Sequence, residues 1–208
     1  GTGAAERLAA LQIPYDYLNK VFLGHLHADH MGDFPALWVG GTINNRTVPL
    51  EVWGPSGSEP QYGTKHAMDG LKQFYNWDIA TRRGAVDAKG QELIVHEFDY
   101  RGENKVIYEE NGVTIRSVPA VHAFDGPVSF RLDWNGLSFV FSSDTFPNKW
   151  FNEYAKNADI VIHDCFVTVD DLINRMNFPV ERALLVGAQV HTPPEAFGKV
   201  MSIVQPRM

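Results

Sequence analysis

The sequence predicts a mixed α/β fold in a single domain, and three observations support this. Short apolar runs bounded by Gly and Pro are typical of buried strands, two Asn-Gly pairs lie between strand-like runs, and other segments have helical spacing. The 208 residues fit one large domain or two small ones. No repeat, low-complexity tract or Pro/Ser-rich linker divides the chain, so one layered domain over residues 1–208 is the simplest interpretation.

The N-terminal half is expected to hold three strands and a helix. Val21-Phe-Leu-Gly24 is a short apolar run that leads into polar residues, and Pro49-Leu-Glu-Val-Trp53 is a second one, stopped by Gly54-Pro55. Residues 64–77 carry apolar side chains at helical spacing. Residues 92–98 alternate like a half-buried strand.

The C-terminal half is expected to contain a β-ladder followed by helices. Asn111-Gly112 and Asn135-Gly136 are strong hairpin signals, because Asn and Gly tolerate the positive φ of a two-residue turn. They predict strands over 105–109, 113–118, 128–133 and 137–141. A further strand is expected over 159–162, and helices over 170–176 and 195–204.

Composition excludes several classes of protein. Hydrophobic residues make up 44% and aromatic residues 12% of the chain, which excludes intrinsic disorder. No apolar run approaches the ~18 residues of a membrane span, so no membrane association is expected. A single cysteine excludes a disulfide framework, and the net charge of −7 argues against a broad basic face for nucleic acid.

The two ends predict a fragment of a longer protein. The chain opens with Gly1-Thr2-Gly3, without an initiator Met, and closes at Met208 directly after a helix-like segment. Neither end is typical of a natural terminus. The lack of a signal peptide therefore gives no information about the compartment.

Three of the eight histidines fall within six residues, in His25-Leu-His-Ala-Asp-His30. His25 and His27 are two apart at a strand end and point the same way, whereas Asp29 and His30 follow where the chain turns and face a second point. This spacing suits two metal ions a few Å apart. Ligands without thiolate favour zinc, with manganese or iron as alternatives. The competing interpretation is a polar turn with coincidental histidines.

Two later residues extend this set. His122 follows a predicted strand; alone it would be interpreted as structural, but beside the first cluster a ligand role is favoured. Asp144 ends the strand-like run Leu137-Ser-Phe-Val-Phe-Ser-Ser-Asp144, where a carboxylate is held rigidly. The alternative for Asp144 is the N-cap of the following helix.

These residues resemble the metal-ligand series of the metallo-β-lactamase fold superfamily. Four other stretches resemble its ribonuclease Z branch: residues 50–55, 106–122, 162–165 and 191–196. Residues 51–57 and 95–100 look most like environmental metallo-β-lactamases of that ribonuclease Z-like branch. The resemblance implies a four-layer αββα fold. It is expected to be incomplete at both ends, because a hairpin layer would precede the first motif and one more zinc ligand would lie beyond Met208.

The resemblance also implies roles for individual residues. It assigns six ligands to two zinc ions: His25, His27 and His122 to one, Asp29 and His30 to the other, and Asp144 as the bridge. A water between two such ions loses its proton near neutral pH and becomes a nucleophile, which Asp29 would orient.

His191 is the expected proton donor to the leaving group, with Asp164 as its orienting partner. Asp164 stands where ribonuclease Z usually has the longer Glu, which puts the geometry of this pair in doubt. The alternative for His191 is a structural histidine at a helix N-terminus, before Pro193.

The remaining chemically active side chains are expected to be structural. His66 and His96 are interpreted as structural or solvated, and Cys165 as a buried thiol. His163 lies either behind the ligands or in the core. Tryptophans expected in the core or a pocket wall are Trp38, Trp53, Trp77 and Trp150.

The function expected from these residues is a two-zinc hydrolase that attacks a carbonyl or phosphoryl centre. β-Lactam-type amide hydrolysis is preferred, and a ribonuclease Z-like phosphodiesterase that processes tRNA 3′ ends is the alternative. A non-catalytic metal-binding module is the third hypothesis, although the intact Asp29 and Asp144 argue against it. The compartment is unknown: a β-lactamase would be periplasmic, and a tRNA-processing nuclease would be cytoplasmic.

A small-molecule substrate is favoured over nucleic acid. Ribonuclease Z carries a basic arm that grips tRNA, inserted after the strand that corresponds to residues 128–133. Here Asn135-Gly136 joins that strand directly to the next, and the net charge is negative. Because phosphate contacts need Lys and Arg, both features weaken a tRNA substrate. The resemblance also allows a homodimer.

Overall fold

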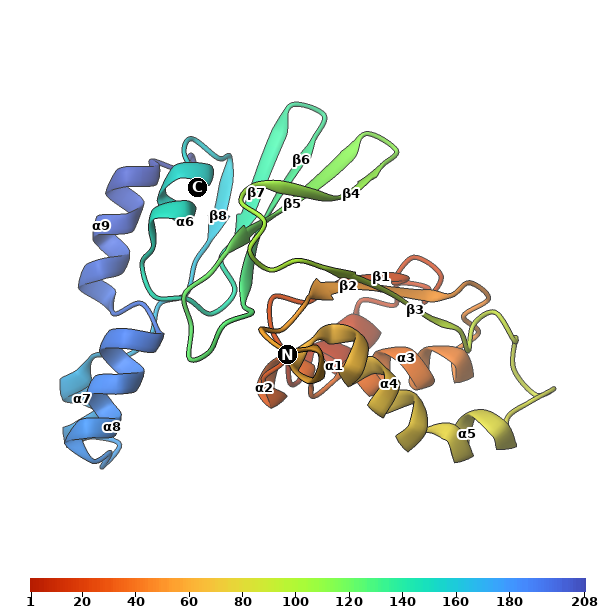
Figure 1. Cartoon of the computed structure of the whole chain (residues 1–208). Coiled ribbons are helices and arrows are strands. Elements are labelled where there is room, and N and C mark those ends of the chain that lie inside the picture. The colour runs from red at the N-terminus through yellow and green to blue at the C-terminus, as the bar shows by residue number, and fades with distance from the viewer. The chain divides into compact units, whose positions relative to one another are not determined.

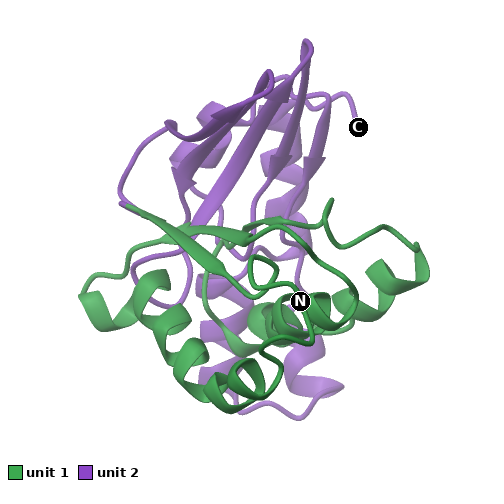
Figure 2. Ribbon diagram, turned by 90° about the vertical axis from the view of Figure 1, so that its right-hand side faces the viewer, with its two compact units in different colours: residues 1–98 green, residues 99–208 purple.

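The computed structural model of the protein describes all residues from 1 to 208. The chain divides into two compact units, residues 1–98 and residues 99–208, which Figure 2 colours separately. Each unit has its own sheet and its own covering helices. That residues 1–208 form a single domain stays a prediction.

Unit 1 contains a three-stranded parallel sheet in the order β1-β2-β3, built from Lys20–Phe22, Leu50–Pro55 and Leu93–Phe98. In its register Val21 pairs with Val52 and Val52 with Val95. Its helices, labelled in Figure 1, are α1 (Ala4–Ala10), α2 (Ala28–Met31), α3 (Phe34–Ile43), α4 (Thr64–Phe74) and α5 (Asn76–Thr81), with a 3₁₀ turn at Pro60–Tyr62.

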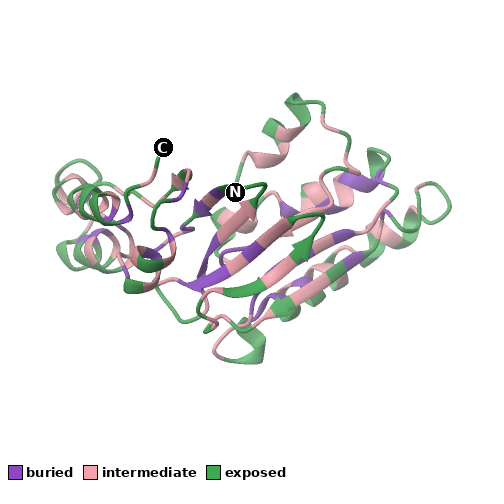
Figure 3. Cartoon of the chain, turned by 90° about the horizontal axis from the view of Figure 1, so that it is seen from above, coloured by how far each residue is buried: buried purple, intermediate pink, exposed green.

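One face of this sheet carries the core of unit 1. Strand β2 is buried at every position except Glu51, whereas β3 is buried only at Leu93; Figure 3 colours the strands by burial. Trp38 of α3 and Met68 of α4 pack with the buried strand residues, together with Leu23, Phe34, Leu50, Val52 and Leu93. Helices α3 and α4 therefore cover this face, and α4 does so as an amphipathic helix that buries its apolar stripe.

Unit 2 contains a five-stranded sheet in sequence order, β4 to β8. The strands are β4 (Lys105–Glu110), β5 (Val113–Pro119), β6 (Val128–Trp134), β7 (Leu137–Phe141) and β8 (Ile160–Ile162). The first four are antiparallel neighbours, and β8 runs parallel to β7. Asn111 and Asn135 have φ of 51° and 50° and each precedes a glycine with positive φ, so both predicted hairpins are confirmed.

One helix of unit 2 lies between β7 and β8 in the sequence, and the others follow β8. They are α6 (Lys149–Tyr154), α7 (Val169–Asn174), α8 (Val180–Leu185), a π-helical segment (Val186–Val190) and α9 (Pro194–Val204). Phe151 of α6 and Val200 of α9 pack on Val140 of β7 in a buried cluster. One face of this sheet is thus covered by α6 and α9, which lie beside it in Figure 1.

Three details differ from the expectations. The helix expected over 64–77 is two helices, because α4 ends at Phe74 and α5 begins at Asn76. Trp77 is 77% exposed on α5, whereas Trp38 and Trp53 are buried as expected. Cys165, in the irregular segment between β8 and the next helix, is exposed rather than buried.

The fold is the one expected, a mixture of sheets and covering helices. None of the helices has the length and apolar run that a bilayer crossing would need.

Candidate metal centre

The first histidine cluster lies in unit 1, in the loop after β1 and on the one-turn helix α2. Leu23 is buried and its N–H donates to the Trp53 carbonyl, which holds the start of the loop on the sheet. His27 is the N-cap residue of α2, with extended backbone angles, and its carbonyl accepts from His30 N–H. The predicted turn at Asp29 and His30 is therefore one helical turn, which puts these two side chains next to the loop histidines.

The imidazoles of this cluster face one another closely. His25 Nε2 lies 3.1 Å from His27 Nδ1, and the His25 and His30 ring centroids are 4.1 Å apart. Two ligand atoms bound at about 2.0–2.1 Å to one tetrahedral zinc lie about 3.3 Å apart, so the spacing of His25 and His27 fits a shared ion. His25 is 5% exposed, which fixes its ring.

Asp29 is the carboxylate of this cluster, and His30 Nε2 lies 3.3 Å from its Oδ2. Burial raises the pKa of Asp29. Its own backbone N–H and the charges of His30, His27 and His25 lower this pKa by a larger amount, so the net shift is downward. The side chain is therefore ionised near neutral pH, as a metal ligand must be.

A second cluster lies in unit 2, where ligand atoms of His122, Asp144 and His191 all lie within 4.8 Å of one another. His122 Nε2 is 3.9 Å from Asp144 Oδ2. His122 Nδ1 donates to the Val190 carbonyl at 3.0 Å, so the neutral ring presents its Nε2 lone pair on the side of Asp144. The donor chemistry of both clusters, imidazole and carboxylate, fits a divalent metal.

The backbone before Asp144 is built around buried serines. Ser142 Oγ donates to the Ser143 carbonyl and accepts from Asp164 N–H, and Ser143 has a φ of +55°. A non-glycine residue in this left-handed region marks a turn held by its surroundings. The N-cap of α6 is Asn148, whose side chain accepts from Phe151 N–H, so the N-cap alternative for Asp144 is wrong.

His191 and Asp164 lie together, as the sequence predicted. His191 Nδ1 donates to Asp164 Oδ2 at 2.9 Å, and the same oxygen accepts from Thr145 N–H. The His191 ring stacks on Phe166 with centroids 4.6 Å apart. His191 also lies 4.0 Å from Asp144 Oδ2, so its position suits both a proton donor and a ligand.

The other histidines lie outside these clusters. His66 is exposed on α4, and His96 pairs with Glu51 at 2.9 Å, so neither faces the ligands described above. His163 is partly buried in unit 2, where its ring contacts Phe151 with centroids 4.5 Å apart. Sequence reasoning missed the Val190 carbonyl and the Ser142 turn. A backbone acceptor leaves no trace in a sequence, whereas Ser142-Ser143 before Asp144 was a visible signal.

Sequence comparison finds no matching family model but clear relatives. The chain is 30% identical over 188 residues to a ribonuclease Z of Mycobacterium marinum and 28% identical over 168 residues to one of Mycobacterium avium. These alignments cover 88% and 78% of the chain. The chain spans 62% and 57% of the length of those relatives.

Solved structures with a similar fold include two metallo-β-lactamase fold proteins. The first is YhfI from Bacillus subtilis, with a TM-score of 0.66, 17% identity and coverage of 100% of this chain and 69% of that one. The second is the short form of human tRNase Z, with a TM-score of 0.68, 15% identity and coverage of 100% and 76%. The chain therefore has the metallo-β-lactamase fold, and its sequence is similar to that of ribonuclease Z proteins.

Proposed function

We propose that this protein is a metal-dependent phosphodiesterase of the ribonuclease Z kind, which cleaves RNA at a phosphodiester bond. The observation that carries the proposal is the His191–Asp164 pair, 2.9 Å apart and next to His122 and Asp144. An RNA leaving oxygen is a poor leaving group and needs a proton, and this pair is placed to supply one. The ribonuclease Z relatives favour this reading over the β-lactam hydrolysis expected first.

The residues expected to bind metal lie in both clusters. His25, His27, Asp29 and His30 of unit 1 and His122 and Asp144 of unit 2 would hold divalent ions. Bound divalent ions would activate water and polarise the phosphoryl oxygen. Zinc is the expected metal because the ligands are imidazole and carboxylate, with manganese and iron as alternatives.

Side chains of the protein would orient the attacking water and supply the proton to the leaving group. Asp29, as a carboxylate, would accept a hydrogen bond from the attacking water and orient it. Asp164 accepts a hydrogen bond from Nδ1–H of His191, which leaves Nε2 as the atom that would deliver a proton to the leaving oxygen. Phe166 stacks on the same ring and restricts its rotation, so that the donor is held in one orientation.

A small amide substrate is the second candidate, and one observation favours it. Strands β6 and β7 are joined by Asn135-Gly136 alone, so no basic arm extends from this hairpin. With a net charge of −7, the chain has fewer means of gripping a long RNA. β-Lactam hydrolysis should therefore be measured alongside phosphodiester hydrolysis.

The experiment combines metal content with turnover. The zinc-loaded chain is assayed with bis(p-nitrophenyl) phosphate, a 3′-extended tRNA and nitrocefin, and its metal is measured by elemental analysis. Asp144→Ala should lower both metal content and phosphodiester turnover, the latter by about 100-fold or more, with the circular dichroism spectrum retained. His66→Ala, on the exposed face of α4, is the matched control and should change neither.

His191→Ala separates the proton donor from a ligand. p-Nitrophenolate leaves without a proton, so the variant should lose about 10²–10⁴-fold on RNA but far less on the nitrophenyl ester, with its metal content kept. An equal loss on both esters together with loss of metal would make His191 a ligand. Faster nitrocefin than phosphodiester turnover would favour the amide reading, and bound metal without any turnover would favour a binding module.

A further inference from the structure

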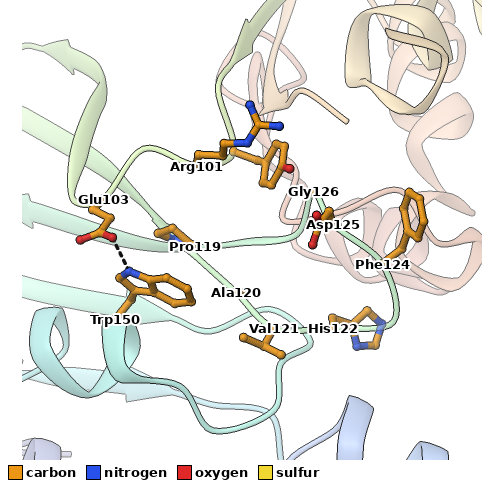
Figure 4. A pocket seen from close by; sticks show the side chains of 11 residues that line it. Arg101, Glu103, Pro119, Ala120, Val121, His122, Phe124, Asp125, Gly126 and Trp150 are labelled. Atoms are coloured by element: carbon orange, nitrogen blue, oxygen red, sulfur yellow. Dashed lines mark hydrogen bonds between the residues drawn. The ribbon is translucent and has the colours of Figure 1, made fainter. Parts of the chain in front are cut away.

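Unit 2 contains a pocket of about 320 Å³ beside His122, within the range of small-molecule sites. Its walls come from three segments: the connection between β3 and β4, the loop that follows β5, and α6. Figure 4 shows Trp150 on one side and His122 and Phe124 on the opposite side, with Arg101 across from Val121. The pocket therefore borders a proposed metal ligand while lying outside the ligand set.

The Trp150 side chain is a fixed aromatic wall. Its Nε1–H donates to Glu103 Oε1 at 2.7 Å, the bond drawn in Figure 4. Lys149 Nζ lies 4.9 Å from the centre of its ring. The residue sits in the first turn of α6, which the buried Asn148 cap holds in place. An indole fixed in this way offers a planar surface at little cost in side-chain entropy.

Charged groups surround this wall. Arg101 lies across the pocket and is stacked over Tyr100 at 4.9 Å, and its guanidinium suits a phosphate oxygen. Asp125 is exposed in the loop after β5, and its carboxylate accepts from amino or ring N–H donors. A flat apolar face with donors on its rim and a phosphate attached is the chemistry of a nucleotide.

We propose that this pocket binds a nucleobase next to the scissile phosphodiester, stacked on Trp150, with the adjoining phosphate near Arg101. This inference rests on the proposed phosphodiesterase function and names a specificity site for it. A base held here lies beside His122, so the scissile phosphate next to it is brought towards the proposed metal ligands. Stacking accepts any base, which suits a site that reads little sequence.

Two substrates with the same leaving group test the proposal. Uridine 5′-(p-nitrophenyl phosphate) carries a base, and methyl p-nitrophenyl phosphate does not. In the zinc-loaded chain, Trp150→Ala should lower kcat/KM for the uridine ester about 5- to 150-fold more than for the methyl ester, mainly through KM. Trp150→Phe should retain most of the preference. Trp77→Ala, a substitution of an exposed tryptophan on α5, is the matched control and should leave the ratio unchanged.

A binding measurement keeps the proposal testable without turnover. Uridine 5′-monophosphate and ribose 5-phosphate are titrated calorimetrically into the same proteins. The wild type should prefer the nucleotide, and Glu103→Ala, which releases the indole at an exposed position, should reduce that preference. If the wild type hydrolyses neither ester, the proposed function fails, and this titration alone decides on the pocket. Equal ratios in wild type and Trp150→Ala, or equal affinity for both phosphates, would overturn the base-binding site.

Discussion

At the scale of single residues, His163 is a partly buried histidine that we expect to make stability depend on pH. Its Nδ1 donates to the Asp164 carbonyl at 2.7 Å, and its Nε2 is buried without a hydrogen-bond partner. Burial lowers the pKa of His163 below the 6.5 of a solvated imidazole, and the carbonyl and charge of Asp164 offset this only in part. The ring is therefore neutral in the folded protein at neutral pH.

The pH dependence of folding follows from this shift. Above pH 6.5 the ring is neutral in both states and contributes no pH dependence, whereas below 6.5 the unfolded chain binds a proton that folded His163 resists. Stability should thus fall with decreasing pH by at most about 1.4 kcal/mol per pH unit from this residue. Thermal unfolding of wild type and His163→Phe at pH 7.5 and 5.5, in chelator, should show a smaller loss in the variant. An identical loss would contradict the shift, and the exposed His66→Phe is the control.

At the scale of elements, helix α3 is held by a fully buried arginine. Arg46 donates to the carbonyls of Trp38 at 3.1 Å and of Leu37 at 2.8 Å, both in α3, and to Leu18 at 3.3 Å in the preceding segment. A Cβ at Gly41 would lie 2.6 Å from the guanidinium carbon, so the helix needs glycine there. Burial lowers the pKa of Arg46 below that of a solvated guanidinium, although the group stays charged at neutral pH.

Removing this arginine should destabilise the protein. Arg46→Met keeps most of the volume but loses three charge-assisted hydrogen bonds, and we expect a loss of about 2–4 kcal/mol in the free energy of unfolding. Gly41→Ala should destabilise as well, because it displaces the same group. Urea titration measures both, with Arg83→Met at an exposed position as a control that changes less than about 0.5 kcal/mol. A shift as small as that of the control would show that Arg46 does not hold α3.

The elements that sequence predicts are those with a local signal. Asn111-Gly112 and Asn135-Gly136 determine their turns through their own backbone preferences, so both hairpins were predictable. Helix α3 has apolar residues on all sides and no side-chain cap, so its periodicity gives no signal. The cap of α6 was not predicted, because the sequence suggested Asp144 as a possible N-cap whereas Asn148 accepts from Phe151 N–H in the structure.

At the scale of the whole molecule, the sequence predicted which residues form the candidate site but not how their side chains are arranged. The spacing His25-x-His27-x-Asp29-His30 carries its own chemistry, and the structure brings these side chains within contact in unit 1. The pairing of His191 with Asp164 joins positions 27 residues apart, and only the resemblance indicated it. The Val190 carbonyl behind His122 depends on a π-helical segment that no local pattern marks.

The net charge of the whole chain predicts how strongly its activity on RNA depends on salt. It has 18 Lys and Arg against 25 Asp and Glu, and its β6–β7 turn carries no basic arm. A protein that makes six to ten phosphate contacts loses about 10³–10⁵ in affinity between 50 and 200 mM salt, whereas about two contacts to a single strand cost roughly sevenfold. We therefore expect kcat/KM on a 3′-extended tRNA to fall less than about tenfold over that range. Steady-state kinetics with bis(p-nitrophenyl) phosphate in the same buffers corrects for salt effects on the chemistry. A loss of 10³ or more would require a basic surface that grips RNA, and it would assign recognition to that surface rather than to the pocket beside His122.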